Sequence, residues 1–187
     1  MATAEALSEH LLTIEEYLQI PDNGQPTELV RGRIVTMNMP APLHGYVSIN
    51  VAGILREFVQ AQDLGRIVGN DSAIVTERGP DTVRGADVAF YSFQRLPKGP
   101  FPKGYLGVVP ELVFEVLSPS DRWREVLAKV AEYLNAGVLM VGVLDPDPKS
   151  LHLFFPDQPA KVLDADQELV LPSILPGFQI QVGKFFE

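Results

Sequence analysis

The sequence predicts one mixed α/β domain in which helices flank a central mixed β-sheet. Its 187 residues suit a single domain, so residues 1–187 are treated as one unit. Hydrophobic residues make up 46% of the chain, which is enough to bury a sizeable core. Segments with strand-like and helix-like periodicity alternate, and no repeat, low-complexity tract or linker interrupts them.

The first third of the chain predicts a short helix, a hairpin and a long helix. Thr13 and Glu16 have the spacing of a capping box, which favours a helix start at Thr13. Gly32 suits the tight turn of a hairpin because glycine accepts a positive φ. The hairpin strands are expected at 28–30 and 33–37, and the long helix, with its apolar stripe, at 42–62.

The middle of the chain predicts a strand–helix–strand unit. Ser120 is expected to cap the helix at its start, and Gly137 to end it. Five apolar residues of this helix share one face: Trp123, Val126, Leu127, Val130 and Leu134. Strands are expected at 66–69, 72–77, 84–92, 111–117 and 138–144, and a long loop at 94–110. Short strands are expected at 151–155, 161–163, 168–171 and 178–182.

Composition excludes several classes of protein. The chain has no cysteine, which rules out disulfides, cysteine zinc sites, iron–sulfur clusters and a cysteine nucleophile. Residues 1–20 contain four glutamates and no Lys or Arg, unlike a secretory signal. The longest apolar run, 137–144, falls far short of the ~20 residues that span a bilayer. We therefore expect a cytoplasmic protein with no membrane partner.

The net charge of −9 is unevenly distributed. Residues 1–30 carry six acids and no Lys or Arg, and residues 130–187 carry eight acids against three Lys. Residues 31–129 carry twelve Lys or Arg against ten acids. The total disfavours contact with phosphates, but the positive charge is concentrated in the segment that also holds the candidate chemistry.

Two acids interrupt segments that otherwise predict buried strands. Asp87 follows Arg84-Gly-Ala, and Glu115 lies in the middle of Glu111-Leu-Val-Phe-Glu-Val-Leu117. A carboxylate inside a strand is costly unless it is paired, protonated or bound to a cation. On neighbouring strands, the two would suit a divalent metal that prefers oxygen ligands. The alternative is that each acid faces solvent or pairs with an arginine such as Arg84 or Arg122.

Three further residues are candidates for the same site. Lys129 lies at the border of the apolar helix stripe, where its ammonium could reach the carboxylates and orient a water. Glu28 heads a strand and is a third acid, and His44 lies near the start of the long helix. Each also has an ordinary interpretation, as a solvated lysine, a surface acid or a capping histidine.

Other chemistries lack their motifs. The three histidines do not form a zinc pattern. No G-x-S-x-G elbow supports a serine hydrolase, and no phosphate-binding loop or dinucleotide fingerprint is present.

The order of these residues resembles a small bacterial restriction-endonuclease-like family of the PD-(D/E)XK nuclease superfamily. The resemblance spans nearly the whole chain, and Glu115-Val-Leu-Ser-Pro-Ser120 is its most specific piece. Its other pieces are Thr13-Ile-Glu-Glu-Tyr17, Glu28-Leu-Val-Arg-Gly32, Pro40-Ala-Pro-Leu-His44, Asp87, Lys129 and Leu175-Pro-Gly-Phe178.

The resemblance implies a restriction-endonuclease-like core with a sheet of four to five strands. It implies that Asp87 and Glu115 bind Mg²⁺ or Mn²⁺, with the Val116 carbonyl as a further ligand. Glu28 would support this site and His44 would line it. Lys129 would supply the catalytic lysine from a helix.

Two positions depart from the superfamily pattern. Ala86 replaces a structural proline beside Asp87, and Leu117 stands where the superfamily has its lysine. Catalysis therefore depends on whether Lys129 reaches the acids.

The first functional hypothesis is a metal-dependent phosphodiesterase, a DNA endonuclease by analogy, in which metal and Lys129 activate a water. It implies a nucleic-acid partner and, as in related nucleases that cut two strands, a homodimer. The alternative is a catalytically inactive nuclease fold that acts as a binding or assembly module. A third hypothesis is a metal-dependent hydrolase that is not a nuclease. The position of Lys129 relative to the acids discriminates between the first two.

Overall fold

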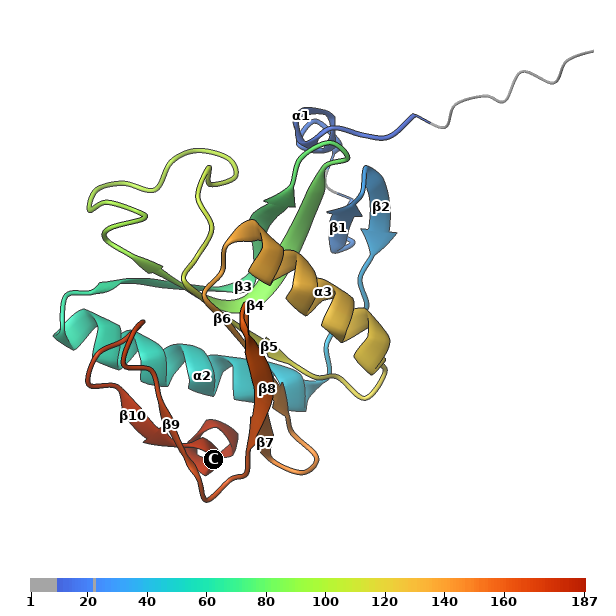
Figure 1. Cartoon of the computed structure of the whole chain (residues 1–187). Helices are drawn as coiled ribbons and strands as arrows, with labels where there is room; N and C mark the ends of the chain where they lie inside the picture. Colours follow the sequence, from blue (N-terminus) through green and yellow to red (C-terminus); the bar gives the residue numbers. More distant parts are fainter. Residues whose placement is uncertain (1–9, 22) are drawn as a thin grey trace, which may run out of the picture.

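Two amphipathic helices cover opposite faces of one large sheet (Figure 1). The structure is a computed structural model that describes residues 10–21 and 23–187. Its helices are α1 (Ile14–Tyr17), α2 (Pro42–Ala61), α3 (Trp123–Ala136) and the short 3-10 helix η1 (Val182–Phe186). Its strands are β1 (Thr27–Val30), β2 (Arg33–Thr36), β3 (Gly65–Glu77), β4 (Thr82–Ser92), β5 (Leu112–Val116), β6 (Met140–Asp145), β7 (Ser150–Phe155), β8 (Gln158–Leu163), β9 (Glu168–Val170) and β10 (Gln179–Gln181).

The main sheet has eight strands, in the order β2-β1-β4-β5-β6-β7-β8, with β3 also paired to β4. Among the strands of the described residues, only β5 and β6 run parallel, and α3 connects them, as the predicted strand–helix–strand unit requires. The family resemblance implied four to five strands, and this number is wrong. The β1–β2 hairpin, β3 and the β7–β8 hairpin extend the core, while β9 and β10 form a separate two-stranded sheet.

The N-terminal elements form as the local sequence predicts. Thr13 and Glu16 make the reciprocal hydrogen bonds of a capping box around α1. Arg31 and Gly32 both adopt positive φ, 50° and 75°, in the two-residue turn between β1 and β2. Two positive φ values give the turn a twist that matches the flanking strands. Within the described residues, no helix has the length and apolar character needed to cross a membrane.

Alternation along β5 divides the core into two layers. Leu112, Phe114 and Val116 face α2, whereas Val113 faces α3. Four α2 residues are fully buried on the first side: Val47, Val51, Leu55 and Val59. The helix η1 and the segment around β9 and β10 pack on the same side. The sheet is thus buried on both faces, which explains the continuous apolar runs of β5 and β6.

The start of α3 differs from the prediction. Ser120 is not the cap, because Asp121 accepts a hydrogen bond from the Ser118 amide at 2.8 Å and holds these residues in a turn. The helix begins two residues later, after Arg122, which makes no side-chain capping bond. Trp123 and Leu127 are 38% and 44% exposed, so the predicted stripe is only partly buried. Val130 and Tyr133 are the residues that α3 buries.

The strand β3 runs continuously through the two strands predicted there, with a bulge between them. The bulge lies between Gly69 and Ser72, and both intervening residues, Asn70 and Asp71, adopt positive φ. Asp87 lies opposite the bulge on β4, and at nearby Gly85, which pairs with Ala73, an added Cβ would lie 3.0 Å from the Asp71 Cβ. Glycine at this position lets the bulge approach β4 closely.

The strand β4 changes partners along one edge, and this opens a gap in the sheet. β1 pairs with β4 at Val83, whereas β5 pairs with residues 88–90. Residues 84–87 therefore lack a strand partner on this edge and must satisfy their backbone groups in another way. We call this stretch the fork of β4.

Candidate active site

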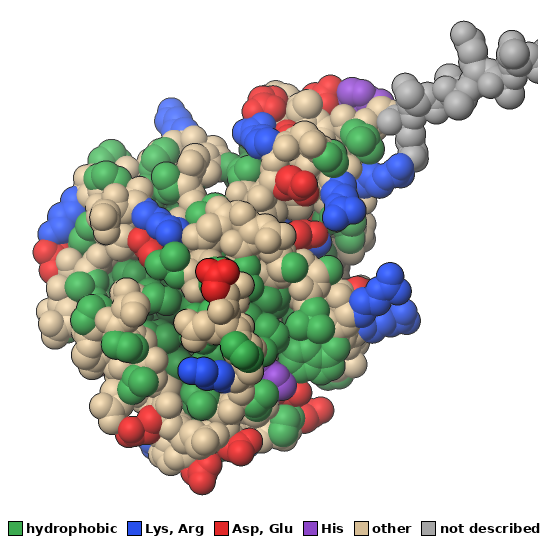
Figure 2. All heavy atoms as spheres, viewed as in Figure 1, with side chains coloured by type: hydrophobic (Ala, Val, Ile, Leu, Met, Phe, Trp, Pro, Cys, Tyr) green, Lys and Arg blue, Asp and Glu red, His purple; other side chains and the backbone are tan. Residues whose placement is uncertain are grey.

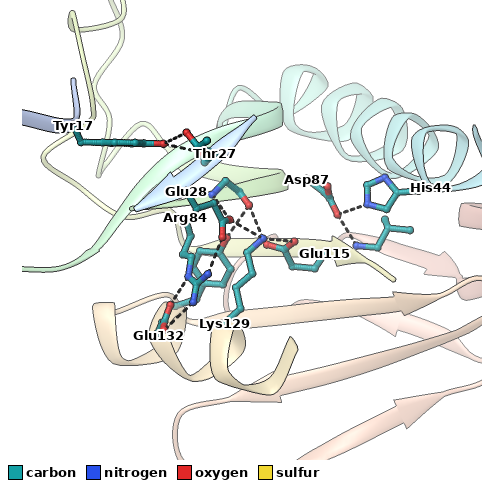
Figure 3. A network of polar contacts seen from close by, with 12 residues as sticks. Tyr17, Thr27, Glu28, His44, Arg84, Asp87, Glu115, Lys129 and Glu132 are labelled. Atoms are coloured by element: carbon teal, nitrogen blue, oxygen red, sulfur yellow. Dashed lines mark hydrogen bonds and ion pairs between the residues drawn. The ribbon is translucent and has the colours of Figure 1, made fainter. Parts of the chain in front are cut away.

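The fork of β4 brings together all five side chains predicted from the sequence (Figure 3). They come from five different elements: Glu28 from β1, His44 from the first turn of α2, Asp87 from β4, Glu115 from β5 and Lys129 from α3. Side chains occupy the place of the missing strand. Glu28 accepts a hydrogen bond from the Gly85 amide at 2.9 Å, and Lys129 donates to the Gly85 carbonyl at 2.7 Å.

Asp87 is held in place by two contacts to one of its oxygens. Its Oδ2 accepts the Val116 amide hydrogen at 2.7 Å and lies 3.1 Å from His44 Nε2. The Val116 backbone is therefore fixed beside this carboxylate. Within the described residues, Oδ1 of Asp87 receives no hydrogen bond and is available to a ligand.

His44 carries a raised pKa although burial alone would lower it. The hydrogen bond and charge of Asp87 outweigh burial, and the charges of Asp71 and Glu115 add to the effect. The imidazole is thus a donor that holds Asp87 from the α2 side of the sheet.

Glu115 is 8% exposed and has one unsatisfied oxygen. Its Oε2 accepts a hydrogen bond from Lys129 at 3.0 Å, whereas Oε1 is buried without a partner among the described residues. Burial raises the pKa of Glu115 to about 8, the Lys129 charge opposes this shift, and the Asp87 charge reinforces it. An unpartnered buried carboxylate oxygen is unfavourable unless a proton or cation binds to it.

Lys129 is shared between two acids and a carbonyl. Besides its bonds to Glu115 and Gly85, its Nζ lies 3.3 Å from Glu28 Oε1. Burial would lower the pKa of Lys129, but the charges of Glu115, Glu28 and Asp87 raise it well above its ordinary value. The ammonium therefore stays protonated in the metal-free protein.

Glu28 also belongs to an ion-pair chain with Arg84 and Glu132, and Lys129 links this chain to Glu115. Arg84 binds Glu28 Oε2 at 2.7 Å and also holds Glu132 of α3 through two hydrogen bonds. Burial would raise the pKa of Glu28, but the charges of Lys129 and Arg84 lower it. With Gly85, Arg84 and Lys129 around its oxygens, Glu28 is suited to position the lysine.

The sequence left open that Asp87 and Glu115 each pair with an arginine, and the structure does not show such pairs. Arg84 pairs with Glu28 and Glu132, as shown above. Among the described residues, 10–21 and 23–187, neither Arg84 nor Arg122 forms an ion pair with Asp87 or Glu115. The cation beside Glu115 is Lys129 instead.

Sequence reasoning missed three participants. Asp71 reaches the site from the β3 bulge, where its pKa is raised by desolvation and by the charge of Asp87. Tyr133 donates to the Gly85 carbonyl at 3.2 Å, and Glu132 anchors Arg84. The adjacent Asn70 and Asp71 in a strand-like segment are the one local signal, because such residues favour bulges and turns.

The residues present fit a small divalent cation. Asp87 and Glu115 offer free carboxylate oxygens, and the Val116 backbone is held next to Asp87. In the described part of the chain, no three His, Asp or Glu side chains converge closely enough to form a complete ligand set. Mg²⁺ does not need one, since it commonly takes one or two carboxylates and fills its shell with waters and substrate phosphate.

Comparisons with known proteins agree with this architecture. The model of the family described as "Uma2: Putative restriction endonuclease" matches residues 14–183. The chain is also similar to a crystal structure of "a putative nuclease belonging to DUF820" from Anabaena variabilis ATCC 29413. The TM-score is 0.82 at 22% identity, over 94% of this chain and 97% of that one. No curated protein matches the chain. The structural likeness confirms the predicted fold class.

Proposed function

The chain belongs to the Uma2 family, as its resemblance to restriction-endonuclease-like proteins led us to expect, and we propose that it is a metal-dependent phosphodiesterase acting on nucleic acid, with DNA as the first candidate. The observation that carries the proposal is the buried Oε1 of Glu115, unpartnered beside Asp87 and within reach of Lys129. Such an oxygen is unfavourable unless a proton or a cation binds to it, and a divalent metal would satisfy it.

In this proposal Asp87, Glu115 and the Val116 carbonyl hold Mg²⁺ or Mn²⁺. When bound, the metal would polarise the scissile phosphate and lower the pKa of an attacking water. The Val116 amide and His44 fix the orientation of Asp87, so that its free oxygen stays directed at the ligand position. Positioning of this kind is what a metal ligand requires from its neighbours.

Lys129 would orient the water and offset negative charge on the phosphate. Because its pKa is raised, the ammonium acts as a hydrogen-bond donor and a fixed positive charge in this site. Its bonds to Glu115 and Gly85 and its contact with Glu28 confine it to one place. Glu28 and Arg84 would thus act on catalysis through the lysine.

The distribution of charged side chains suits a site in which a bound metal, and not a basic surface, attracts the phosphate of the substrate. Figure 2 shows Lys and Arg side chains scattered over the visible face, with Asp and Glu side chains both at its lower end and in its upper part, around α1. No continuous basic surface covers that face. A bound divalent cation would supply the positive charge that an acidic protein lacks at the scissile phosphate.

The inactive-module alternative is disfavoured at the site, since Lys129 contacts Glu115 and Glu28, and His44 and the Val116 amide hold Asp87. The homodimer and the cytoplasmic location stay predictions.

The test is calorimetric titration of Mg²⁺ and Mn²⁺ into the wild type and Asp87→Ala, with cleavage of plasmid and single-stranded DNA measured in parallel. Asp157→Ala, in the exposed turn between β7 and β8, is the matched control. We expect Asp87→Ala to lose metal binding and cleavage together, and the control to keep both. Absence of binding at millimolar metal in the wild type would overturn the metal site.

A further inference from the structure

A pocket of about 270 Å³ opens beside the catalytic cluster, on the side of Glu28 and Gly85. Its polar wall consists of Glu28, Arg84, Gly85 and Asp71, of which the first and third contact Lys129 directly. The pocket is therefore next to the place where the scissile phosphate would lie. The remaining walls are largely apolar: Tyr17, Pro26, Thr27, Met37, Ala73, Val83 and Tyr105.

Two tyrosine rings give this pocket an aromatic character. The Tyr17 hydroxyl is hydrogen-bonded to the Thr27 carbonyl at 2.8 Å and contacts its side-chain oxygen at 2.7 Å, which fixes the ring on β1 (Figure 3). Tyr105 comes from the long loop between β4 and β5. Burial raises the pKa of Tyr105, and the nearby Tyr17 phenol adds to this shift, so the two side chains lie close together. The loop thus places a second ring beside one that is already held.

The chemistry of the walls selects a neutral planar ligand. A phosphate would meet the carboxylates of Glu28 and Asp71, whereas Arg84 is already engaged by Glu28 and Glu132. A nucleobase has no charge to repel and has faces that stack on aromatic rings. The pocket volume of about 270 Å³ leaves room for one base.

The surface beyond Tyr105 fits the next part of a nucleic-acid chain. Tyr105 also lines a second pocket, of about 520 Å³, whose walls include Lys103 and Arg78. Arg78 is paired with Glu15 and Asp81, but Lys103 forms no ion pair within the described residues. A nucleic-acid strand that leads away from the metal site would therefore pass the pocket lined by Tyr17 and Tyr105 and then the ammonium of Lys103.

We propose that this pocket, which we name the Tyr17–Tyr105 pocket, binds one unpaired nucleobase next to the scissile phosphate. The proposal rests on the nuclease function proposed above and deepens it. It requires the base to leave its stack, so the substrate is single-stranded or carries an extruded nucleotide. Asp71, which accepts no hydrogen bond among the described residues, would favour a base with an exocyclic amino group.

The experiment is an abasic scan. Fluorescent 12-residue single-stranded DNA oligonucleotides, each with one abasic position, are titrated with the full chain in Ca²⁺, and anisotropy reports affinity. We expect one position to weaken wild-type binding about tenfold. In Tyr105→Ala the intact oligonucleotide should already bind about tenfold more weakly, and the same abasic position should cost nothing further. Tyr105→Phe should behave as the wild type.

Tyr46→Ala is the matched control, because Tyr46 is an exposed tyrosine on α2 outside the pocket. The wild-type scan needs no variant, so the proposal stays testable if Tyr105→Ala fails to fold. A flat wild-type profile, or a position-specific loss that persists unchanged in Tyr105→Ala, would overturn the pocket.

Cleavage assays in Mg²⁺ with the same oligonucleotides separate the two proposals. Metal-dependent cleavage with a flat abasic profile overturns the pocket and leaves the nuclease function standing. A Tyr105-dependent profile without cleavage in Mg²⁺ or Mn²⁺ supports the pocket and overturns the nuclease. Lack of binding to any oligonucleotide overturns both.

Discussion

At the scale of single residues, the site depends on which acceptors the Lys129 ammonium contacts. Lys129 contacts Glu115, Glu28 and the Gly85 carbonyl. It neutralises part of the charge of the acids without reaching the free Oε1 of Glu115. The lysine and a metal can therefore be present together, on different oxygens of the same carboxylate.

Replacing the lysine should separate chemistry from metal binding. We expect Lys129→Met to lower the cleavage rate about 100-fold or more, because a fixed charge at the phosphate is lost. Mg²⁺ binding should persist but weaken at neutral pH, since Lys129 does not contact the free Oε1 of Glu115 but its charge opposes the rise in the pKa of that carboxyl. Cleavage assays and calorimetry measure the two effects, with exposed Lys161→Met of β8 as the control. Loss of metal binding in Lys129→Met would contradict this division of roles.

Protonation of Glu115 should make metal binding depend on pH. Burial raises its pKa to about 8, with Asp87 reinforcing and Lys129 opposing the shift, so most of the carboxyl is protonated at neutral pH in the metal-free protein. The protonated form favours folding below the ordinary pKa, and this contribution is lost as the pH rises through about 8. Metal must displace the proton.

We therefore expect Mg²⁺ affinity to increase from pH 6 to about 8, with proton uptake by the buffer on binding. Calorimetry in buffers of different ionisation enthalpy measures this release. Glu115→Gln should remove the proton release together with most of the affinity. Affinity that is constant from pH 6 to 8 would argue against a protonated Glu115.

At the scale of elements, the fork of β4 and the bulge of β3 create the space for the site. β1 and β5 pair with different ends of β4, so that the backbone at Gly85 is satisfied by side chains. The bulge brings Asp71 toward the same place, and the absence of a side chain at Gly85 admits it. The fork is not visible in the pattern of β4 alone, whereas Asn70 and Asp71 are a local signal for the bulge.

A methyl group at Gly85 should disturb this arrangement. Its Cβ would lie 3.0 Å from the Asp71 Cβ and 3.1 Å from the Asp71 carbonyl oxygen. We expect Gly85→Ala to destabilise the protein by about 1–3 kcal/mol and to reduce cleavage. Gly53→Ala on α2 is the control, because nothing lies within 4 Å of its added Cβ, and it should stabilise by about 0.5–1 kcal/mol. Urea unfolding measures both, and equal effects would contradict the crowding at Gly85.

The ends of α3 should respond differently to alanine. Ser120→Ala should change stability by less than about 0.5 kcal/mol, because Ser120 does not cap the helix. Gly137→Ala should cost about 1 kcal/mol or more, because Gly137 ends α3 with a φ of 105°. Thermal unfolding of the two variants gives the comparison, and a larger loss for Ser120→Ala would show that the cap has been misplaced.

The sequence predicted the residues of the site better than its surroundings. Asp87 and Glu115 stand out because an acid in an apolar strand requires an explanation, and Lys129 because of its place on an amphipathic helix. The partners of Arg84 could not be predicted, since β1 and α3 meet only in the folded sheet. The strand count of four to five was wrong because it came from the family resemblance, whereas the residue pattern itself predicted the additional strands, including β2.

At the scale of the whole molecule, the proposed function requires an acidic protein to bind a polyanion. Its net charge is −9, and the visible basic side chains are scattered (Figure 2). Few phosphates can then be contacted at once. Divalent metal and base stacking would have to supply most of the affinity, which is unlike proteins that track the backbone with a basic groove.

Binding to DNA should accordingly depend on metal more than on salt. We expect single-stranded DNA affinity to be at least about tenfold higher in Ca²⁺ than in EDTA. The slope of log affinity against log salt concentration should be no steeper than about −4, the value for a handful of phosphate contacts. Anisotropy titrations from 50 to 200 mM NaCl measure it. A steep slope with no effect of EDTA would indicate an ordinary basic interface.

Because Lys129 lies on a helix and not on the strand of Glu115, sequence searches for the superfamily motif can miss proteins like this one. Leu117 occupies the position along the chain where the superfamily pattern has its lysine, and it packs in the same cluster as Val130 of α3. Lys129, twelve residues further along the chain, reaches Glu115 from α3 instead. A genome scan that demands acid and lysine at fixed spacing would pass over this protein. A three-dimensional template of two carboxylates and one ammonium would retrieve it, and would group it with nucleases whose written motifs look unrelated.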